Sequence, residues 1–144
     1  MKMISHRGNV RGMIKESENN PTYINAAISD GYDVEIDVWK TIDGLFLGHD
    51  CPQYGIDKEY LKNDRFWCHA KNIEALEFML KNNIRCFWHQ EDEYTLTSDG
   101  VIWTYPMKDT TKTSVIVCRT LEESVKQSKA NVYGICSDFI GEIK

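Results

Sequence analysis

The chain has 144 residues, of which 42% are hydrophobic, and a formal net charge of −5 with a pI near 5.3. This hydrophobic share argues against intrinsic disorder, and the length is that of one domain over residues 1–144. The acidic balance argues against bulk electrostatic binding to nucleic acid. No apolar run approaches the roughly 20 residues of a membrane span, and the chain enters a strand at once. We therefore expect neither membrane insertion nor a signal peptide.

The predicted strands alternate with helices along most of the chain. Each strand is a short apolar or strictly alternating run bounded by turn residues. The predicted strands cover residues 3–6, 33–39, 45–49, 66–71, 85–89, 101–105, 114–118 and 132–137.

Three helices are predicted between them, over residues 20–31, 72–82 and 120–130. Asn20 caps the first, Pro21 fits its first turn and Gly31 ends it. The spacing of apolar residues predicts two buried faces, Ile24, Ala27 and Ile28 in the first helix and Ile73, Leu76 and Leu80 in the second.

Eight strands, several of them separated by helices, predict a parallel α/β fold of the small (β/α)8 TIM-barrel type. Such a barrel usually needs about 250 residues. Several connecting helices must therefore be reduced to loops, and segments 51–65 and 90–100 have that character. An open α/β sheet is the alternative architecture.

Five cysteines occur, and four lie in predicted strands: Cys68, Cys86, Cys118 and Cys136. The odd number and the spacing fit neither a disulfide framework nor a cysteine zinc site. We expect reduced thiols that pack as small core residues in a cytoplasmic protein.

Glu35 and Asp37 are the strongest candidates for metal binding. One residue apart on a strand, they share one face, while Val34, Ile36 and Val38 share the other. Two adjacent carboxylates require a cation, and Mg²⁺ or Ca²⁺ suits oxygen ligands. The alternative is an ordinary solvated acidic face on a half-buried strand.

All four histidines lie at or near the carboxyl ends of predicted strands: His6, His49, His69 and His89. Active sites of parallel α/β folds form at that edge, although a single histidine there is more often structural. His6 and His49 flank the acidic pair and suit a general acid and a general base. Arg7 and Lys71 are the cations best placed for an anionic oxygen, with ordinary surface charge as their alternative.

Other polar and aromatic segments are weaker candidates. Residues 89–93 are rich in ligand-type side chains but read as a solvated acidic loop. Trp39 and residues 103–105 are candidates to line a pocket, although aromatic residues in strands are usually core. Ser5 and the cysteines lack a local base, which argues against a covalent mechanism.

Four motifs, in this order and spacing, resemble the glycerophosphodiester phosphodiesterase family, part of the phosphatidylinositol-specific phospholipase C-like group of barrel phosphodiesterases. They are His6-Arg7-Gly8, Glu18-Asn19, Glu35-x-Asp37 and His49-Asp50. Residues 132–139 and 102–104 are similar to late strands of that family, so a shortened form of it would span nearly the whole chain.

The resemblance implies a (β/α)8 barrel with a divalent metal that hydrolyses a glycerophosphodiester-like or other small phosphodiester, a reaction of lipid metabolism. Matched by position, the implied roles are catalysis for His6 and His49, metal binding for Glu35 and Asp37, phosphate binding for Arg7 and Lys71, and support for Glu18.

His69 stands where the family has a third acidic ligand, and we expect it to be the third metal ligand. Imidazole is softer than carboxylate and adds no negative charge, so Mn²⁺ or Zn²⁺ become candidates beside Mg²⁺ and Ca²⁺.

A second hypothesis is a degenerate barrel that binds a phosphorylated ligand without hydrolysing it. The substitution at His69 and the small size motivate it, while the retained pair His6 and His49 argues against it. The thin helical cover expected for so short a barrel also favours a homodimer.

Overall fold

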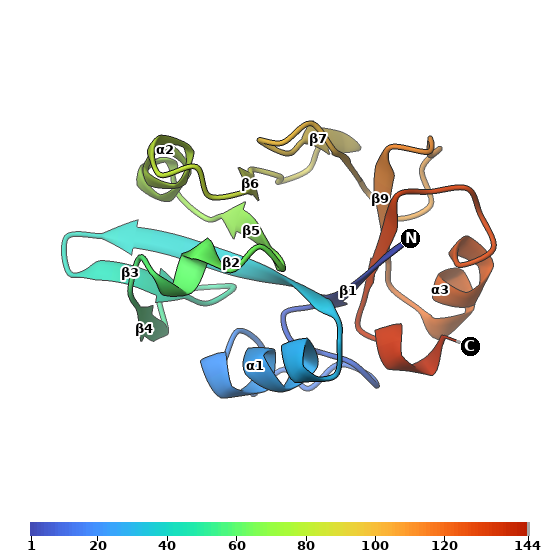
Figure 1. The fold of residues 1–144 in the computed structure, drawn as a ribbon, viewed down its shortest axis with the longest axis horizontal. Coiled ribbons are helices and arrows are strands. Elements are labelled where there is room, and N and C mark those ends of the chain that lie inside the picture. Colours follow the sequence, from blue (N-terminus) through green and yellow to red (C-terminus); the bar gives the residue numbers. More distant parts are fainter. Residues whose placement is uncertain (144) are drawn as a thin grey trace.

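The computed structural model describes residues 1–143, which form a mixed α/β fold around one curled sheet (Figure 1). Its strands are β1 (Lys2–His6), β2 (Asp33–Thr41), β3 (Gly44–Leu47), β4 (Tyr54–Ile56), β5 (Phe66–Ala70), β6 (Cys86–Phe87), β7 (Tyr94–Leu96), β8 (Ile102–Thr104), β9 (Ser114–Cys118) and β10 (Gly134–Ser137). Its helices are α1 (Pro21–Ser29), α2 (Ile73–Lys81) and α3 (Leu121–Gln127), with short 3₁₀ turns η1 (Tyr60–Lys62) and η2 (Ile140–Glu142).

The parallel strands follow the order β6-β5-β2-β1-β10-β9-β8. β7 pairs antiparallel with β8. β3 pairs antiparallel with residues 38–41 of β2, and β4 pairs antiparallel with β3. Figure 1 shows the row bending into a ring, with β6 and β7 near each other at the top of the view. There the Ser98 amide donates a 2.8 Å hydrogen bond to the Cys86 carbonyl oxygen. The curled sheet is compatible with a reduced TIM-type barrel.

The interior of the curl holds a core drawn from strands at both ends of the row. Trp103 of β8 lies with its ring centroid 4.4 Å from that of Phe87 on β6 and 5.9 Å from that of Trp67 on β5. Ile4 and Cys136, on the central strands, belong to the same buried cluster. Because side chains fill the floor of the curl, the polar residues at the strand ends lie on top of a packed core.

The helices cover the outer face of the curl. α1 packs on β2, α2 on β2, β5 and β6, and α3 on β9 and β10. All three begin as predicted, at the capping side chains of Asn20, Asn72 and Thr120. No helix within residues 1–143 combines the length and apolar character that crossing a bilayer requires.

The prediction of eight parallel strands is wrong in two respects. β3, predicted as a parallel strand, runs antiparallel to β2, because only Ile42 and Asp43 separate the two strands and a parallel crossover needs a dozen residues or more. Segments 51–65 and 90–100, predicted as loops, contain β4 and β7. Both are three-residue strands on antiparallel edges, too short for an apolar period to show.

The predicted buried face of α2 is also wrong in part. Ile73 and Leu80 are 59% and 52% exposed, whereas Ala75 and Met79 are fully buried. Ala75 and Met79 are one turn apart and lie against the sheet, with Leu76 partly buried beside them. The helix carries apolar residues on more than one side, so the spacing of these residues alone predicted the wrong face as buried.

The prediction that the four strand cysteines pack in the core is confirmed. Cys68, Cys86, Cys118 and Cys136 are buried, and these and the exposed Cys51 are free thiols. Burial raises the pKa of the Cys118 thiol to about 12, which keeps it protonated and unreactive at neutral pH.

Candidate active site

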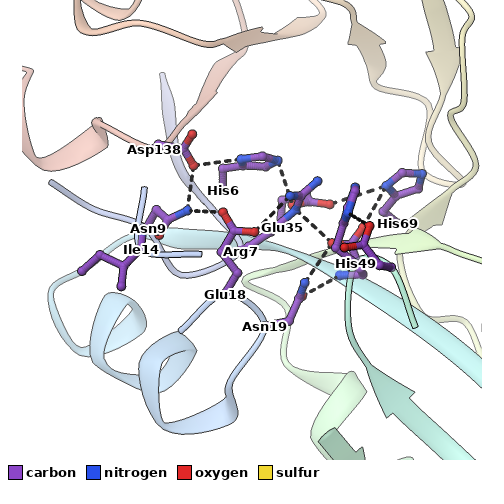
Figure 2. A network of polar contacts seen from close by, with 12 residues as sticks. His6, Arg7, Asn9, Ile14, Glu18, Asn19, Glu35, His49, His69 and Asp138 are labelled. Carbon is purple, nitrogen blue, oxygen red and sulfur yellow. Dashed lines mark hydrogen bonds and ion pairs between the residues drawn. The ribbon is translucent and has the colours of Figure 1, made fainter. Parts of the chain in front are cut away.

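The first strand ends in a sharp turn that exposes two polar side chains at the rim of the curl. Arg7 and Gly8 both have a left-handed backbone, with φ of 57° and 95°. A Cβ on Gly8 would lie 2.7 Å from Cδ1 of Tyr23, so only glycine fits there. Strained backbone of this kind clusters at functional sites. The turn directs His6 and Arg7 into the centre of the polar network in Figure 2.

Glu35 and Asp37 point from β2 toward the same centre, opposite to their apolar neighbours. They are 3% and 0% exposed, and Val34, Ile36 and Val38 pack in the outer core. The predicted alternation is confirmed, and the alternative of a solvated acidic face is wrong. Two carboxylates buried side by side repel each other unless positive charge is near.

Glu35, Asp37 and His69 each offer one atom that could ligate a metal ion, and these three atoms all lie within 4.8 Å of one another. His69 Nδ1 is 3.2 Å from Asp37 Oδ1 and 3.7 Å from Glu35 Oε1. Glu35 Oε2 and Asp37 Oδ1 are buried without a hydrogen-bond partner in the described part of the chain. A divalent cation would satisfy these oxygens, and the donor set therefore fits such an ion.

The His69 ring is fixed in an orientation that suits a metal ligand. Its Nε2 lies 2.7 Å from the His89 carbonyl oxygen, and its ring stacks on Phe87 at 5.1 Å and 9°. Because a carbonyl only accepts, Nε2 must carry the hydrogen, and Nδ1 faces the carboxylates. In the tautomer with hydrogen on Nε2 alone, Nδ1 would present its lone pair to a cation held by the two carboxylates, as metal-binding imidazoles do.

Asp37 is held by groups from three segments. Asn19 donates from Nδ2 to Asp37 Oδ2 at 2.9 Å and accepts from the Asp37 amide at 2.9 Å. Arg7 Nε lies 3.0 Å from Asp37 Oδ2, and Lys71 Nζ lies 3.8 Å from Oδ1. Burial alone would raise the pKa of Asp37, but His69, Arg7 and Lys71 lower it well below its usual range. Burial and the charge of Asp37 raise the pKa of Glu35.

His6 is paired with an acid from the far end of the chain. Its Nδ1 lies 2.9 Å from Asp138 Oδ1, which leaves Nε2 facing Glu35 at 3.8 Å (Figure 2). Burial alone would lower the pKa of His6. The hydrogen bond to Asp138 and the charge of Glu35 outweigh the effect of burial, so the pKa of His6 is raised. The acid thus holds the ring with one nitrogen free for proton transfer.

Asn9 and Glu18 support this pair from behind. Asn9 Nδ2 donates to Asp138 Oδ1 at 2.8 Å and to Glu18 Oε1 at 3.0 Å, and Arg7 donates to Glu18 Oε2 at 3.1 Å. Glu18 is 8% exposed and therefore acts on the site through its neighbours. Sequence reasoning gave no role to Asp138 or Asn9. The position of Asp138 directly after the last strand was the one signal that could have indicated its role.

His49 reaches the site on the β2–β3 hairpin instead of on a parallel strand. Trp39 Nε1 donates to the Gly48 carbonyl oxygen at 2.7 Å, and a Cβ on Gly48 would lie 2.0 Å from the Cys51 carbonyl oxygen. This tight loop presents His49, whose Nδ1 lies 2.8 Å from Asp50 Oδ1 and whose side chain is 44% exposed.

One cavity of about 400 Å³ joins these groups. All four histidines line it, as do Arg7, Glu35, Lys71 and Asp138, and Trp103, Tyr105 and Arg119 form much of the remaining wall. The four histidines thus meet in one cavity, although the strand before His49 is antiparallel. Trp39 and Thr104 are not among the lining residues. A larger hollow of about 700 Å³, beside η1 and Asp99, contains none of these groups.

Comparison with known proteins gives one informative likeness. No family model matches the chain, and no curated protein matches its sequence. Its structure is similar to the crystal structure of glycerophosphodiester phosphodiesterase from Agrobacterium tumefaciens str. C58, with a TM-score of 0.60 over 98% of this chain and 96% of that chain. The two are 11% identical in sequence, so the likeness is one of fold.

Proposed function

We propose that this chain is a reduced (β/α)8 barrel enzyme that hydrolyses a small phosphodiester, of the glycerophosphodiester kind, with a divalent metal. One observation carries the proposal: a histidine–acid pair, a buried donor cluster and two cations meet in a single cavity. The fold of the Agrobacterium tumefaciens enzyme, which is described as a glycerophosphodiester phosphodiesterase, supports it.

Glu35, Asp37 and His69 would hold the metal, which when bound neutralises and polarises the phosphate. The imidazole nitrogen makes this donor set more favourable to Mn²⁺ and Zn²⁺ than an all-oxygen set. For this reason Mn²⁺ and Zn²⁺ stand beside Mg²⁺ and Ca²⁺ as candidates. The buried free thiols support a reducing, cytoplasmic location.

Arg7 and Lys71 bind the non-bridging oxygens of the phosphate. Both are mostly buried, with side chains 17% and 18% exposed, and both are anchored on Asp37. Cations fixed before the substrate arrives stabilise the charge that develops during the reaction without reorganising.

His6 and His49 divide the two proton transfers. One removes the proton from the nucleophile, which is water or a neighbouring substrate hydroxyl, and the other protonates the leaving alkoxide. His6 keeps Nε2 free because Asp138 holds Nδ1, and His49 keeps Nε2 free because Asp50 holds Nδ1. Each ring thus has one nitrogen for the substrate and one for its supporting acid.

The test is a screen of small glycerophosphodiesters against metal-free protein supplied with Mg²⁺, Ca²⁺, Mn²⁺ or Zn²⁺, with products followed by phosphorus NMR. The expected result is metal-dependent release of the alcohol, with a phosphate monoester as the other product if water is the nucleophile and a cyclic phosphodiester if a substrate hydroxyl is. Saturable binding without hydrolysis under every metal would instead indicate a protein that only binds a phosphorylated ligand.

A further inference from the structure

One wall of the cavity has no part in the proposed reaction. It is formed by segments that follow β6, β8 and β9, and its polar members are His89, Gln90, Tyr105 and Arg119. They line the same cavity of about 400 Å³ as the catalytic histidines. Cavities for whole small molecules range from roughly 300 to 1,000 Å³. With the phosphate on the opposite wall, this wall faces one of the two alcohols that the phosphate joins.

Arg119 supplies a cation that has no acidic partner in the described part of the chain. No carboxylate in residues 1–143 lies within ion-pair distance of its guanidinium, whereas Arg7 on the opposite wall contacts two. The guanidinium lies 5.0 Å from the centre of the Tyr105 ring and donates to the Tyr105 hydroxyl. The Arg119 amide is held by the Glu123 carboxylate at 2.8 Å. The charge is thus oriented but not neutralised.

His89 supplies unused hydrogen-bonding capacity beside it. Both ring nitrogens are buried and have no partner among the described residues, and the ring centroid lies 5.6 Å from that of Tyr105. Leaving buried polar atoms unpaired costs free energy that a bound ligand recovers. A neutral imidazole offers one donor and one acceptor, which matches a hydroxyl group.

We propose that this wall selects phosphodiesters in which one alcohol carries a hydroxyl for His89 and an anionic group, carboxylate or phosphate, for Arg119. The inference rests on the proposed function, because the reacting phosphate must lie against the opposite wall. Guanidinium groups bind both anions through two parallel hydrogen bonds. Tyr105 is a positioning residue that holds the guanidinium. An alcohol with a cationic group would meet Arg119 as a like charge and be disfavoured.

The test uses four diesters that share one glycerol and differ in the second alcohol: glycerate, glycerol phosphate, glycerol and choline. For the wild-type protein we expect kcat/KM for the anionic diesters to exceed that for the glycerol diester by about tenfold. Arg119→Gln should bring this ratio close to one. The glycerate and glycerol phosphate arms tell which anion the wall prefers.

Arg11→Gln is the matched control, because it removes the same charge from a side chain that is 80% exposed and lies outside the cavity. It should leave the ratio unchanged. Tyr105→Phe should give an intermediate ratio, through a rise in KM that is larger for the anionic diesters than for the glycerol diester. Equal ratios in wild type and Arg119→Gln would overturn the proposal.

Calorimetry separates this inference from the proposed function. If no diester is hydrolysed, binding of the glycerate and glycerol diesters to wild type and Arg119→Gln is compared directly. Tighter binding of the glycerate diester that is lost in Arg119→Gln supports the anionic wall even without catalysis. Equal affinities, or no binding of either diester, would overturn it.

Discussion

The two walls of the cavity are built in opposite ways. On the wall of β1, β2 and β5, the charged side chains hold one another: Arg7 contacts Asp37 and Glu18, and His6 contacts Asp138. On the wall that follows β6, β8 and β9, Arg119 and His89 have polar atoms without partners among residues 1–143. Apart from Glu35 Oε2 and Asp37 Oδ1, which are left for a cation, the first network is closed on itself and keeps its geometry before a ligand binds, whereas the open groups of the second wall are completed by the ligand. Under the proposed function, this difference would separate the groups that carry out the reaction from those that recognise the substrate.

The largest effect is expected at the histidines of the first wall. His6→Ala should lower turnover by roughly 100- to 10,000-fold, since a positioned acid or base contributes on that order. Circular dichroism should report an intact fold, and metal binding should persist because the donor cluster is unchanged. Full activity in this variant would contradict the mechanism.

His49→Ala sharpens the same point, because His49 lies on an exposed loop while His6 is held by a buried acid. Both variants should lose turnover if the two rings divide the proton transfers. Loss in only one of them would assign both transfers to that ring.

The next largest effect is expected from metal removal, which should lower the stability of the fold. An ion at 100 times its dissociation constant stabilises the fold by about 2.7 kcal/mol. For a chain of this length, that raises Tm by roughly 5 to 10 °C in a calorimetric scan.

Glu35→Gln is the matched variant for that measurement. Burial and Asp37 raise the pKa of Glu35, so this carboxyl group lowers the stability of the metal-free fold as the pH rises from its unfolded pKa through the raised folded value. At neutral pH the variant should melt higher than the wild type without metal, and metal should no longer raise its Tm. An equal metal response in both proteins would remove Glu35 from the ligand set.

Asn19→Ala should show how much the closed network contributes to stability. Asn19 bonds the Asp37 side chain and amide, and it has a left-handed backbone with φ of 62° that asparagine tolerates better than alanine. Leaving those buried groups unpaired should cost about 1 to 3 kcal/mol in urea unfolding. A variant as stable as the wild type would show that water replaces the amide.

The smallest effect is expected beside the hollow remote from the site, at Asp99. Burial alone would raise the pKa of Asp99, but Thr97 and Arg85 lower it. The pair with Arg85 therefore stabilises the fold above the unfolded pKa of Asp99 and is lost as pH falls through the lowered folded value. Asp99→Asn should cost about 1 kcal/mol or less at neutral pH, with the difference vanishing in acid and turnover unchanged.

Much of this site could be predicted because its chemistry lies at strand ends. The alternation around Glu35 and Asp37 indicates which side chains share a face, and a parallel arrangement brings strand ends to one rim. The direction of β3 was also readable, since the turn at Asp43-Gly44 is a hairpin signal. Taking that segment as a parallel strand ignored the length that a crossover needs.

The partners of the site residues could not be predicted in the same way. Asp138 is 132 positions from His6, and no local period links them. Asn9 and Asn19 act through loop geometry that depends on the backbone turn at Arg7 and Gly8. Which face of α2 is buried depends on which of its apolar residues pack against the sheet, and tertiary packing decides this.

The double use of β2 has a consequence for how such a site can change over generations. Residues 34–38 of β2 pair with β5 in the curled sheet, and residues 38–41 pair with β3 in the hairpin that leads to His49. The relative positions of the two carboxylates and His49 are therefore fixed together, by one strand and its hairpin. Insertions at the hairpin tip, where Ile42 is fully exposed, lengthen the ribbon without altering those positions, whereas a one-residue slip within the strand would turn all of its chemistry outward.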